Sequence, residues 1–166
     1  FPMTTKLKEF DKWLYTPHDL KVMVIGVESL SAGAMPKLLD KFCMAHTKVM
    51  MVIDESHLIG NFKAKRTIEC INMRHKTEYR ATLTGTPIST GPMNLFSQFE
   101  FLDPDIIGIG DFYSFRNRYA VMGGYKDPKS GKPMQIVGYQ NIDELTQTVA
   151  PFTFECRKSD VLDLPP

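Results

Sequence analysis

The chain has 166 residues, with 43% hydrophobic and 23% charged side chains and a formal net charge of +1. This composition is ordinary for a globular protein and suits one domain or part of one. The charge gives no global field that would attract nucleic acid, although a local basic stripe would suffice for DNA. The three cysteines lack metal-ligand spacing, and nothing resembles a signal peptide or a membrane span. We therefore expect a reduced, intracellular protein with no membrane partner.

The first predicted elements are a helix, a strand and a second helix. Residues 1–15 mix apolar and charged side chains at roughly helical spacing, which predicts a short amphipathic helix with Trp13 as a packing anchor. Residues 21–27 are apolar and rich in β-branched side chains, so they predict a strand that leads into Ser29. Residues 33–45 predict the second helix, and Ser29 or Ser31 is a candidate to cap it.

The next strand ends in two acids. Residues 49–53 form a continuous apolar run, which is typical of a strand buried on both faces of a parallel sheet. Asp54 and Glu55 follow directly, and buried carboxylates are costly, so we expect them at the carboxyl edge of the sheet, where open α/β folds bind ligands. One acid there can hold a hydrated Mg²⁺ and the other can orient or deprotonate a water, while His57 can hydrogen-bond through either ring nitrogen. The alternative is a strand that ends in a polar turn.

A further strand is predicted at residues 79–83, about one βαβ crossover downstream of the acids. It ends in Thr84, Gly85 and Thr86, a small turn with two hydroxyl groups. Adjacent parallel strands would place this turn beside the acids, and the alternative is an ordinary strand-to-helix cap. The crossover at residues 62–75 predicts a basic amphipathic helix, whose charges either form a solvated face or contact phosphate. Ile68 and Ile71 are expected on the buried side of the basic helix.

Helices dominate the rest of the chain. Residues 120–140 are rich in glycine and predict an exposed loop or irregular hairpin, and the letters SGKP within it lack the first glycine of a P-loop. Asp111 and Asn141 are expected as N-caps. Three more helices are predicted, at residues 91–102, 111–119 and 141–149.

The ordered motifs resemble those of superfamily-two helicases, and the sequence segments around them resemble those of the Swi/Snf-type ATPases. VIDESH looks like motif II and LTGTP looks like motif III of that superfamily. HLIGNFKAKRT, LFSQFEFLDPDIIG, FYSFRNRY and VAPFTFECRKSDVLDLPP are similar to Swi/Snf segments in the same order, so the resemblance covers residues 22–166. The resemblance implies an α/β fold, a partial RecA-like parallel sheet flanked by helices, with a helical and loop extension after motif III.

The resemblance also implies an ATP-dependent DNA translocase or remodeller that uses ATP and Mg²⁺. Asp54 would hold Mg²⁺ through water, and Glu55 would act on the attacking water. His57, together with the turn at residues 84–86, would relay the nucleotide state. Ser56 stands where DEAH-type proteins have Ala, and Gly60 stands where Lys or Arg is common.

For nucleic acid, the resemblance implies contact with the DNA backbone through Ser29, Asn61 and Lys65. The P-loop of the family lies upstream of the residues seen here. Residues 1–166 are therefore expected to be a single partial domain, the later part of the first lobe, with residues 159–166 starting the linker to the second RecA-like lobe. That lobe and the upstream P-loop segment would be its partners, in the cytoplasm, nucleoid or nucleus. The segment alone is expected to be inactive.

Two other classes of protein stay open from the sequence. One is a non-catalytic interaction module that keeps a helicase-like lobe as a docking surface, although the intact pair of acids argues weakly against it. The other is the motor lobe of a restriction or nuclease complex, which would need further acids converging on Asp54.

Overall fold

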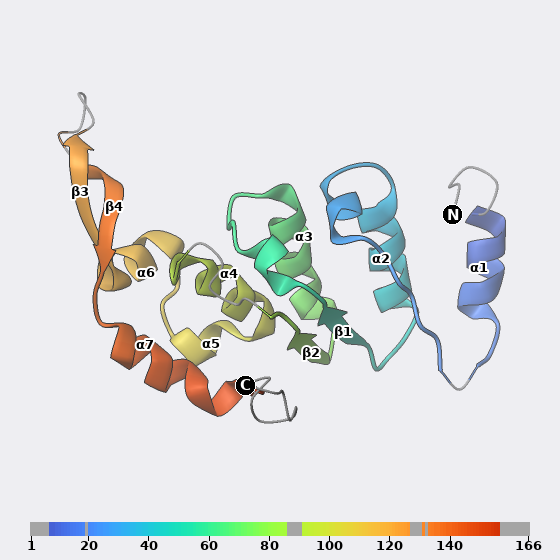
Figure 1. Ribbon diagram of the computed structural model, residues 1–166. Helices are drawn as coiled ribbons and strands as arrows, with labels where there is room; N and C mark the ends of the chain where they lie inside the picture. The colour runs from blue at the N-terminus through green and yellow to red at the C-terminus, as the bar shows by residue number, and fades with distance from the viewer. Residues whose placement is uncertain (1–6, 19, 86–90, 127–130, 132, 157–166) are drawn as a thin grey trace, which may run out of the picture. The chain divides into compact units, whose positions relative to one another are not determined.

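The computed structural model describes residues 7–18, 20–85, 91–126, 131 and 133–156. The chain divides into two compact units, residues 1–103 and 104–166. The expected α/β class is confirmed, because helices accompany a parallel pair of strands in the first unit and an antiparallel pair in the second (Figure 1). That residues 1–166 form a single partial domain stays a prediction. No helix in the described ranges is long and apolar enough to cross a membrane.

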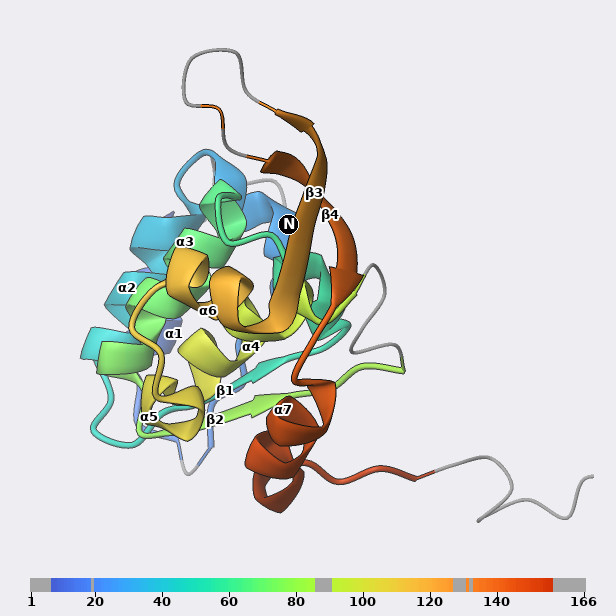
Figure 2. The ribbon, with the colours of Figure 1, turned by 90° about the vertical axis from the view of Figure 1, so that its left-hand side faces the viewer.

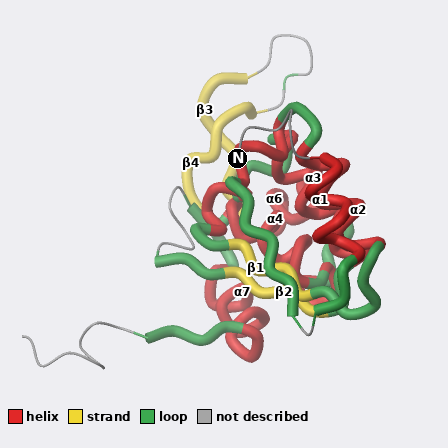
Figure 3. The backbone as a smooth tube through the Cα atoms, turned by 90° about the vertical axis from the view of Figure 1, so that its right-hand side faces the viewer, coloured by secondary structure: helices red, strands yellow, loops and turns green. Residues whose placement is uncertain are grey.

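The first unit is built around two parallel strands. Strand β1 (Met50–Ile53) lies beside strand β2 (Tyr79–Thr82) (Figure 3). Met50 lies opposite Tyr79, and Ile53 lies opposite Thr82. The predicted strand positions at residues 49–53 and 79–83 are therefore confirmed, but the expected burial of the first strand on both faces is wrong, because Met50 and Val52 are exposed. The elements of this unit are α1 (Leu7–Tyr15), η1 (Val27–Ser31), α2 (Met35–Met44), β1 (Met50–Ile53), η2 (Ser56–Ile59), α3 (Lys65–Met73), η3 (Arg74–Lys76), β2 (Tyr79–Thr82) and α4 (Met93–Leu102).

One face of the strand pair packs against helices. The buried cluster there takes Ile53 from β1, Leu39 from α2, Cys70 from α3 and Phe101 from α4. Arg80 of β2 fixes the end of α4, since its Nε donates to the Leu102 carbonyl at 2.7 Å. This cluster holds the strand ends, and thus the residues that follow them, on a packed base.

The opposite face of the strand pair carries exposed apolar side chains. Met50 and Val52 of β1 are 61% and 48% exposed, and Tyr79 of β2 is 52% exposed. The register places Met50 and Tyr79 side by side on this face. Parallel sheets are almost always covered on both faces, so this surface is one that further protein is expected to cover.

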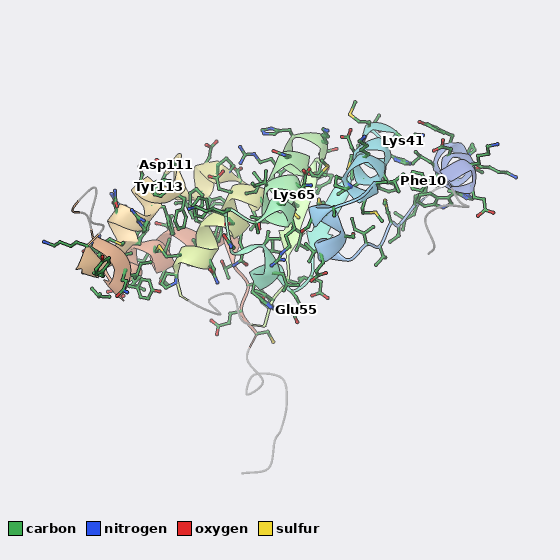
Figure 4. The ribbon with its side chains drawn as sticks, turned by 90° about the horizontal axis from the view of Figure 1, so that it is seen from above. Phe10, Lys41, Glu55, Lys65, Asp111 and Tyr113 are labelled. Atoms are coloured by element: carbon green, nitrogen blue, oxygen red, sulfur yellow. The ribbon has the colours of Figure 1, made fainter. Side chains whose placement is uncertain are left out.

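Helix α1 docks on α2 through an aromatic contact. The Trp13 ring stacks on Phe42, with ring centroids 5.8 Å apart and an interplanar angle of 15°. Beside it, Lys41 Nζ of α2 lies 2.6 Å from Asp11 Oδ1 of α1, and Figure 4 shows Lys41 and Phe10 on these neighbouring helices. The prediction that Trp13 anchors the first helix is confirmed.

The predicted strand at residues 21–27 is wrong. Residues 20–26 form neither helix nor strand, and η1 begins at Val27. The side chains do alternate as in a strand, since Ile25 packs on the core whereas Val22 and Val24 are 67% and 89% exposed. In the described part of the chain, however, β1 and β2 are the only members of the parallel sheet. An alternating sequence specifies extended backbone, but a strand also needs a partner strand.

The second unit contains a hairpin and short helices. Its strands form an antiparallel pair (Figure 2). Ala120 lies opposite Tyr139, and the register shifts further along. The predicted N-cap Asp111 is confirmed, because its Oδ1 accepts the backbone N–H groups of Tyr113 and Ser114. The elements are α5 (Pro104–Ile107), α6 (Phe112–Tyr119), β3 (Ala120–Lys126), β4 (Pro133–Tyr139), α7 (Ile142–Val149) and η4 (Ala150–Phe152).

Asn141 stands at the N-cap position of α7, but its side chain does not cap the helix. It adopts the left-handed conformation at φ 54°, and its Nδ2 donates instead to the Arg118 carbonyl at 2.8 Å. Nearby, Glu144 Oε1 accepts from Arg118 Nε at 2.7 Å and from Tyr119 Oη at 2.9 Å. These two hydrogen bonds hold the pKa of Glu144 below its ordinary value, and the bond from Arg118 has the larger effect. The expected cap at Asn141 is therefore wrong, because its backbone is left-handed and not extended as at a capping residue, and its side chain bonds to Arg118.

Candidate active site

The two acids follow β1 in a strained turn. Asp54 and Glu55 are both exposed, and Glu55 adopts the left-handed conformation with φ 49° and ψ 52°. The Glu55 N–H donates to Asp54 Oδ1 at 2.9 Å, which folds the first carboxylate back over the turn. Left-handed backbone costs a residue with a Cβ atom about 1–2 kcal/mol, so surrounding contacts must hold Glu55 there. In Figure 4, Glu55 lies at the edge of the ribbon.

Backbone hydrogen bonds join the acidic turn, residues 54–57, to the end of β2. Leu83 N–H donates to the Ile53 carbonyl at 2.8 Å, and Ser56 N–H donates to the Leu83 carbonyl at 3.0 Å. Glu55 therefore lies inside a loop whose two flanks both bind Leu83. The ladder of the sheet thus continues across the acidic turn and fixes both of its ends.

The same ladder brings the hydroxyl-bearing turn beside the acids. Thr84 follows Leu83 directly and is half-buried, and Gly85 is exposed. The third residue of this predicted group, Thr86, lies outside the described residues. The structure thus places Thr84 next to the acidic turn, as parallel neighbouring strands require.

His57 completes the acidic turn. Its Nδ1 lies 3.2 Å from Glu55 Oε2, within ion-pair distance, although the two groups do not meet hydrogen-bond geometry. Both side chains have access to solvent, so this pair contributes little to stability. Its consequence is positional, because the imidazole and the Glu55 carboxylate face each other across the turn.

The surroundings of Gly60 explain why this position differs from the family that the motifs resemble. An added Cβ at this position would lie 2.7 Å from Asn94 Cγ, inside the packing of α4. Ser97 Oγ of α4 also donates to the Gly60 carbonyl at 3.2 Å. Because α4 approaches so closely, the Lys or Arg that is common in the family has no room here.

The residues expected to contact nucleic acid lie on elements that pack together. α3, which begins with Lys65, packs against η1 and η2. Ser29 Oγ of η1 donates to the Gly26 carbonyl at 2.6 Å, so this hydroxyl supports its own turn and does not cap α2. Asn61 and Lys65 are exposed, and Asn61 Oδ1 accepts the Lys63 N–H at 3.0 Å. Lys65 stands at the N-terminus of α3, whose N-cap residue, Ala64, makes no capping bond through its side chain.

The donor set at the acidic turn fits a hydrated Mg²⁺. This ion usually keeps several waters and takes only one or two carboxylates together with substrate phosphates. Asp54 and Glu55 offer two exposed carboxylates at the strand end. In the ranges that the structure describes, no three His, Cys, Asp or Glu side chains are grouped to hold a metal ion. The residues present therefore suit a metal held mainly through water and phosphate.

One residue of this site escaped the sequence prediction. Gln98 of α4 is 3% exposed, and its Oε1 accepts a hydrogen bond from Ser56 Oγ at 2.6 Å. A signal was present, since Gln98 stands between Phe96 and Phe99 in the helix, and Ser56 replaces the Ala of DEAH-type proteins. These two polar residues meet in space.

Comparison with known proteins places the chain in a family. The family model of the SNF2-related domain matches residues 4–166, so the chain belongs to the SNF2-related (Swi/Snf) family. This agrees with the resemblance that the motifs indicated. No solved structure gave a significant match.

Curated relatives resemble the chain over about two thirds to three quarters of its length. TATA-binding protein-associated factor mot1 of Aspergillus fumigatus is 38% identical over 117 residues, which is 69% of this chain and 6% of that protein. TATA-binding protein-associated factor 172 of Homo sapiens is 34% identical over 116 residues, again 69% and 6%. DNA excision repair protein ERCC-6 of Mus musculus is 30% identical over 129 residues, or 75% and 8%. The chain thus spans less than a tenth of the length of these relatives.

Proposed function

We propose that this chain is the later part of the first ATP-hydrolysing lobe of a motor that moves on duplex DNA. The observation that carries the proposal is Glu55, an exposed acid in left-handed backbone at the end of a parallel strand. Strain of this kind clusters at active sites, where the surrounding structure maintains it. The family supports the same assignment, because SNF2 proteins are DNA-dependent ATPases.

Each residue of the acidic turn has a role in this proposal. Asp54 would hold Mg²⁺ through a water, and the bound ion would neutralise charge on the phosphates. Glu55 orients the attacking water and accepts its proton. His57 faces the Glu55 carboxylate at 3.2 Å and, with Thr84 and Thr86, relays the state of the nucleotide towards the nucleic-acid surface.

The nucleic-acid surface of this proposal lies where α3 packs against η1. Lys65 and the uncapped N-terminus of α3 present positive potential to solvent, which favours phosphate. Asn61 lies just before this helix, and Ser29 lies on η1. Contacts of this type hold the DNA backbone without reading its sequence, so binding should be non-specific and sensitive to salt.

Other parts of the longer protein would complete the motor. The exposed face with Met50, Val52 and Tyr79 supports this view, since an uncovered parallel sheet is unusual. We propose that the upstream P-loop segment covers that face and that the second RecA-like lobe follows the linker at residues 159–166. The complete protein would act inside the cell, in the cytoplasm, nucleoid or nucleus.

Replacing Glu55 tests the proposed chemistry in the longer protein. Glu55→Gln should still bind ATP but hydrolyse it about 10²–10⁴-fold more slowly, which is the usual effect of removing a general base. Asp54→Asn should instead weaken Mg²⁺-dependent nucleotide binding. Glu78→Gln is the matched control, because Glu78 is an exposed acid at the opposite end of β2. Parental hydrolysis by both Glu55→Gln and Asp54→Asn would leave the non-catalytic interaction module as the better description.

Replacing Lys65 tests the nucleic-acid surface. Lys65→Glu should lower the DNA-stimulated ATPase rate of the longer protein more than its basal rate, because it acts on the track and not on the nucleotide. Lys12→Glu makes the same charge change at an exposed position of α1, a helix that docks on α2. Rates measured across a salt series decide the matter, since equal stimulation in Lys65→Glu and the parent at every salt concentration would remove Lys65 from the surface.

A further inference from the structure

A buried polar pair lies directly behind the acidic turn. Ser56 is fully buried and Gln98 is 3% exposed, and the Ser56 hydroxyl donates to Gln98 Oε1 at 2.6 Å. Buried polar groups are costly unless they are hydrogen-bonded. The pair also joins segments that are 42 residues apart in the sequence. It therefore ties α4 to the acidic turn through a short, directional bond.

Gln98 is itself held in place on α4. Its Nε2 donates to the Asn94 carbonyl at 3.2 Å, one helical turn earlier. With the amide nitrogen engaged there, Oε1 is directed at Ser56. The orientation of the acceptor is thus set by the helix before the acidic turn meets it.

Ser56 is the residue that fixes the far end of the strained backbone at Glu55. Its N–H donates to the Leu83 carbonyl at 3.0 Å and its hydroxyl donates to Gln98 Oε1, so both of its hydrogen-bond donors are bonded. On the near side, Asp54 Oδ1 accepts the Glu55 N–H. Bonds on both sides of Glu55 thus hold its backbone in the left-handed conformation.

We propose that Gln98 is a positioning residue, which acts through Ser56 to hold the Glu55 carboxylate in its working direction. This inference rests on the proposed function, because it concerns the base of the same reaction. Gln98 is buried and its Oε1 bonds to Ser56, the neighbour of Glu55 in the chain, so its contribution is geometric. A displacement of about 1 Å at a reacting group can cost on the order of 10²-fold in rate.

Ser97 provides a matched control on the same helix. It is also fully buried, and its hydroxyl donates to the Gly60 carbonyl at 3.2 Å. It therefore ties α4 to the loop beyond η2 and not to the acidic turn. Removing either hydrogen bond should lower stability, but only the bond from Ser56 to Gln98 should affect the direction of Glu55.

The experiment measures ATP hydrolysis by the longer protein at saturating DNA. Gln98→Leu and Ser56→Ala should each lower kcat between about tenfold and hundredfold, while KM for ATP changes less than about twofold. The double variant should be no slower than the slower single variant, because both changes break one bond. Ser97→Ala should keep the parental kcat, and melting temperatures recorded alongside separate lost stability from lost rate.

The outcomes separate the two levels of the proposal. Gln98→Leu at the parental kcat, beside an inactive Glu55→Gln variant, would overturn the positioning role alone. An equal loss in Ser97→Ala would also overturn it, since a general loosening of α4 would then explain the effect. A parental rate in Glu55→Gln itself would overturn the proposed function. Should Gln98→Leu fail to fold, Ser56→Ala tests the same bond from the acidic turn and decides by the same criteria.

Discussion

The backbone at Glu55 makes a prediction that does not depend on catalysis. Glu55→Gly should be more stable than Glu55→Ala, the reverse of the usual order. Left-handed backbone costs a residue with a Cβ about 1–2 kcal/mol, whereas Gly loses about 0.5–1 kcal/mol more chain entropy than Ala on folding. The difference at φ 49° is therefore roughly 0.5–1 kcal/mol in favour of Gly. The backbone bond to Asp54 persists in both variants and cancels.

The assay is urea unfolding followed by tryptophan fluorescence. Trp13 is the single tryptophan of the chain, and it stacks on Phe42 in the same compact unit as Glu55. Its signal therefore reports the unit in which the change is made. Asn72 provides the control, since it is exposed in α3, where Ala should exceed Gly by about 1 kcal/mol. The sign of the Gly–Ala difference should thus invert between the two positions.

The same sign at both positions would refute the argument. If Glu55→Ala were as stable as Glu55→Gly, the strand-end acid would not occupy left-handed backbone, and the observation that carries the proposed function would fall. If Gly were favoured at both positions, the effect would belong to the unfolded chain and not to the turn. The expected inversion would show that Glu55 is kept in a strained backbone conformation that Gly would adopt at lower cost.

Three further predictions concern other parts of the chain. Cys156 is exposed, whereas burial raises the pKa of the Cys70 thiol to about 12, so a thiol reagent at pH 8 should modify Cys156 quickly and Cys70 only after unfolding. Phe101→Ala should cost about 3–5 kcal/mol in urea unfolding, because the side chain is fully buried in the first unit, while Phe101→Leu should cost much less. Hydrogen bonds from the Ser114 hydroxyl and backbone hold the pKa of Asp111 below its ordinary 3.8, so this acid stabilises the fold above that pH. The stability gap between the parent and Asp111→Ala should therefore shrink as the pH falls below 3.8, and a gap that widened in acid would contradict the cap.

Local chemistry carried most of the successful sequence predictions. The cap at Asp111 needs only the N–H groups of the next turn, and a helix with Trp13 on its apolar side needs only helical spacing. The apolar run before Asp54 likewise predicts a strand that ends in acids, as the structure has it. These features are set within a few residues of one another, so no knowledge of distant segments is needed.

The prediction of the buried side of α3 was wrong because a hydrogen bond allows a polar side chain to be buried there. Ile68 was expected on the buried side of α3, but it is 45% exposed. Thr67 is fully buried in its place, and its hydroxyl donates to the Ile59 carbonyl at 3.2 Å. The hydroxyl thus no longer opposes burial, and the helix turns by about one residue from the orientation that apolarity alone favours.

The sequence by itself determined the alternating exposure of residues 22–25, the acids after β1 and the family to which they belong. Only the tertiary structure decided that this segment joins no strand pair in the described part of the chain, because pairing depends on a partner distant in sequence. It also decided that the amide of Asn141 binds Arg118 and that Gln98 reaches Ser56 across 42 residues. Hydrogen bonds of this kind are fixed by packing, since each donor has several possible acceptors until the core brings one of them within 3 Å.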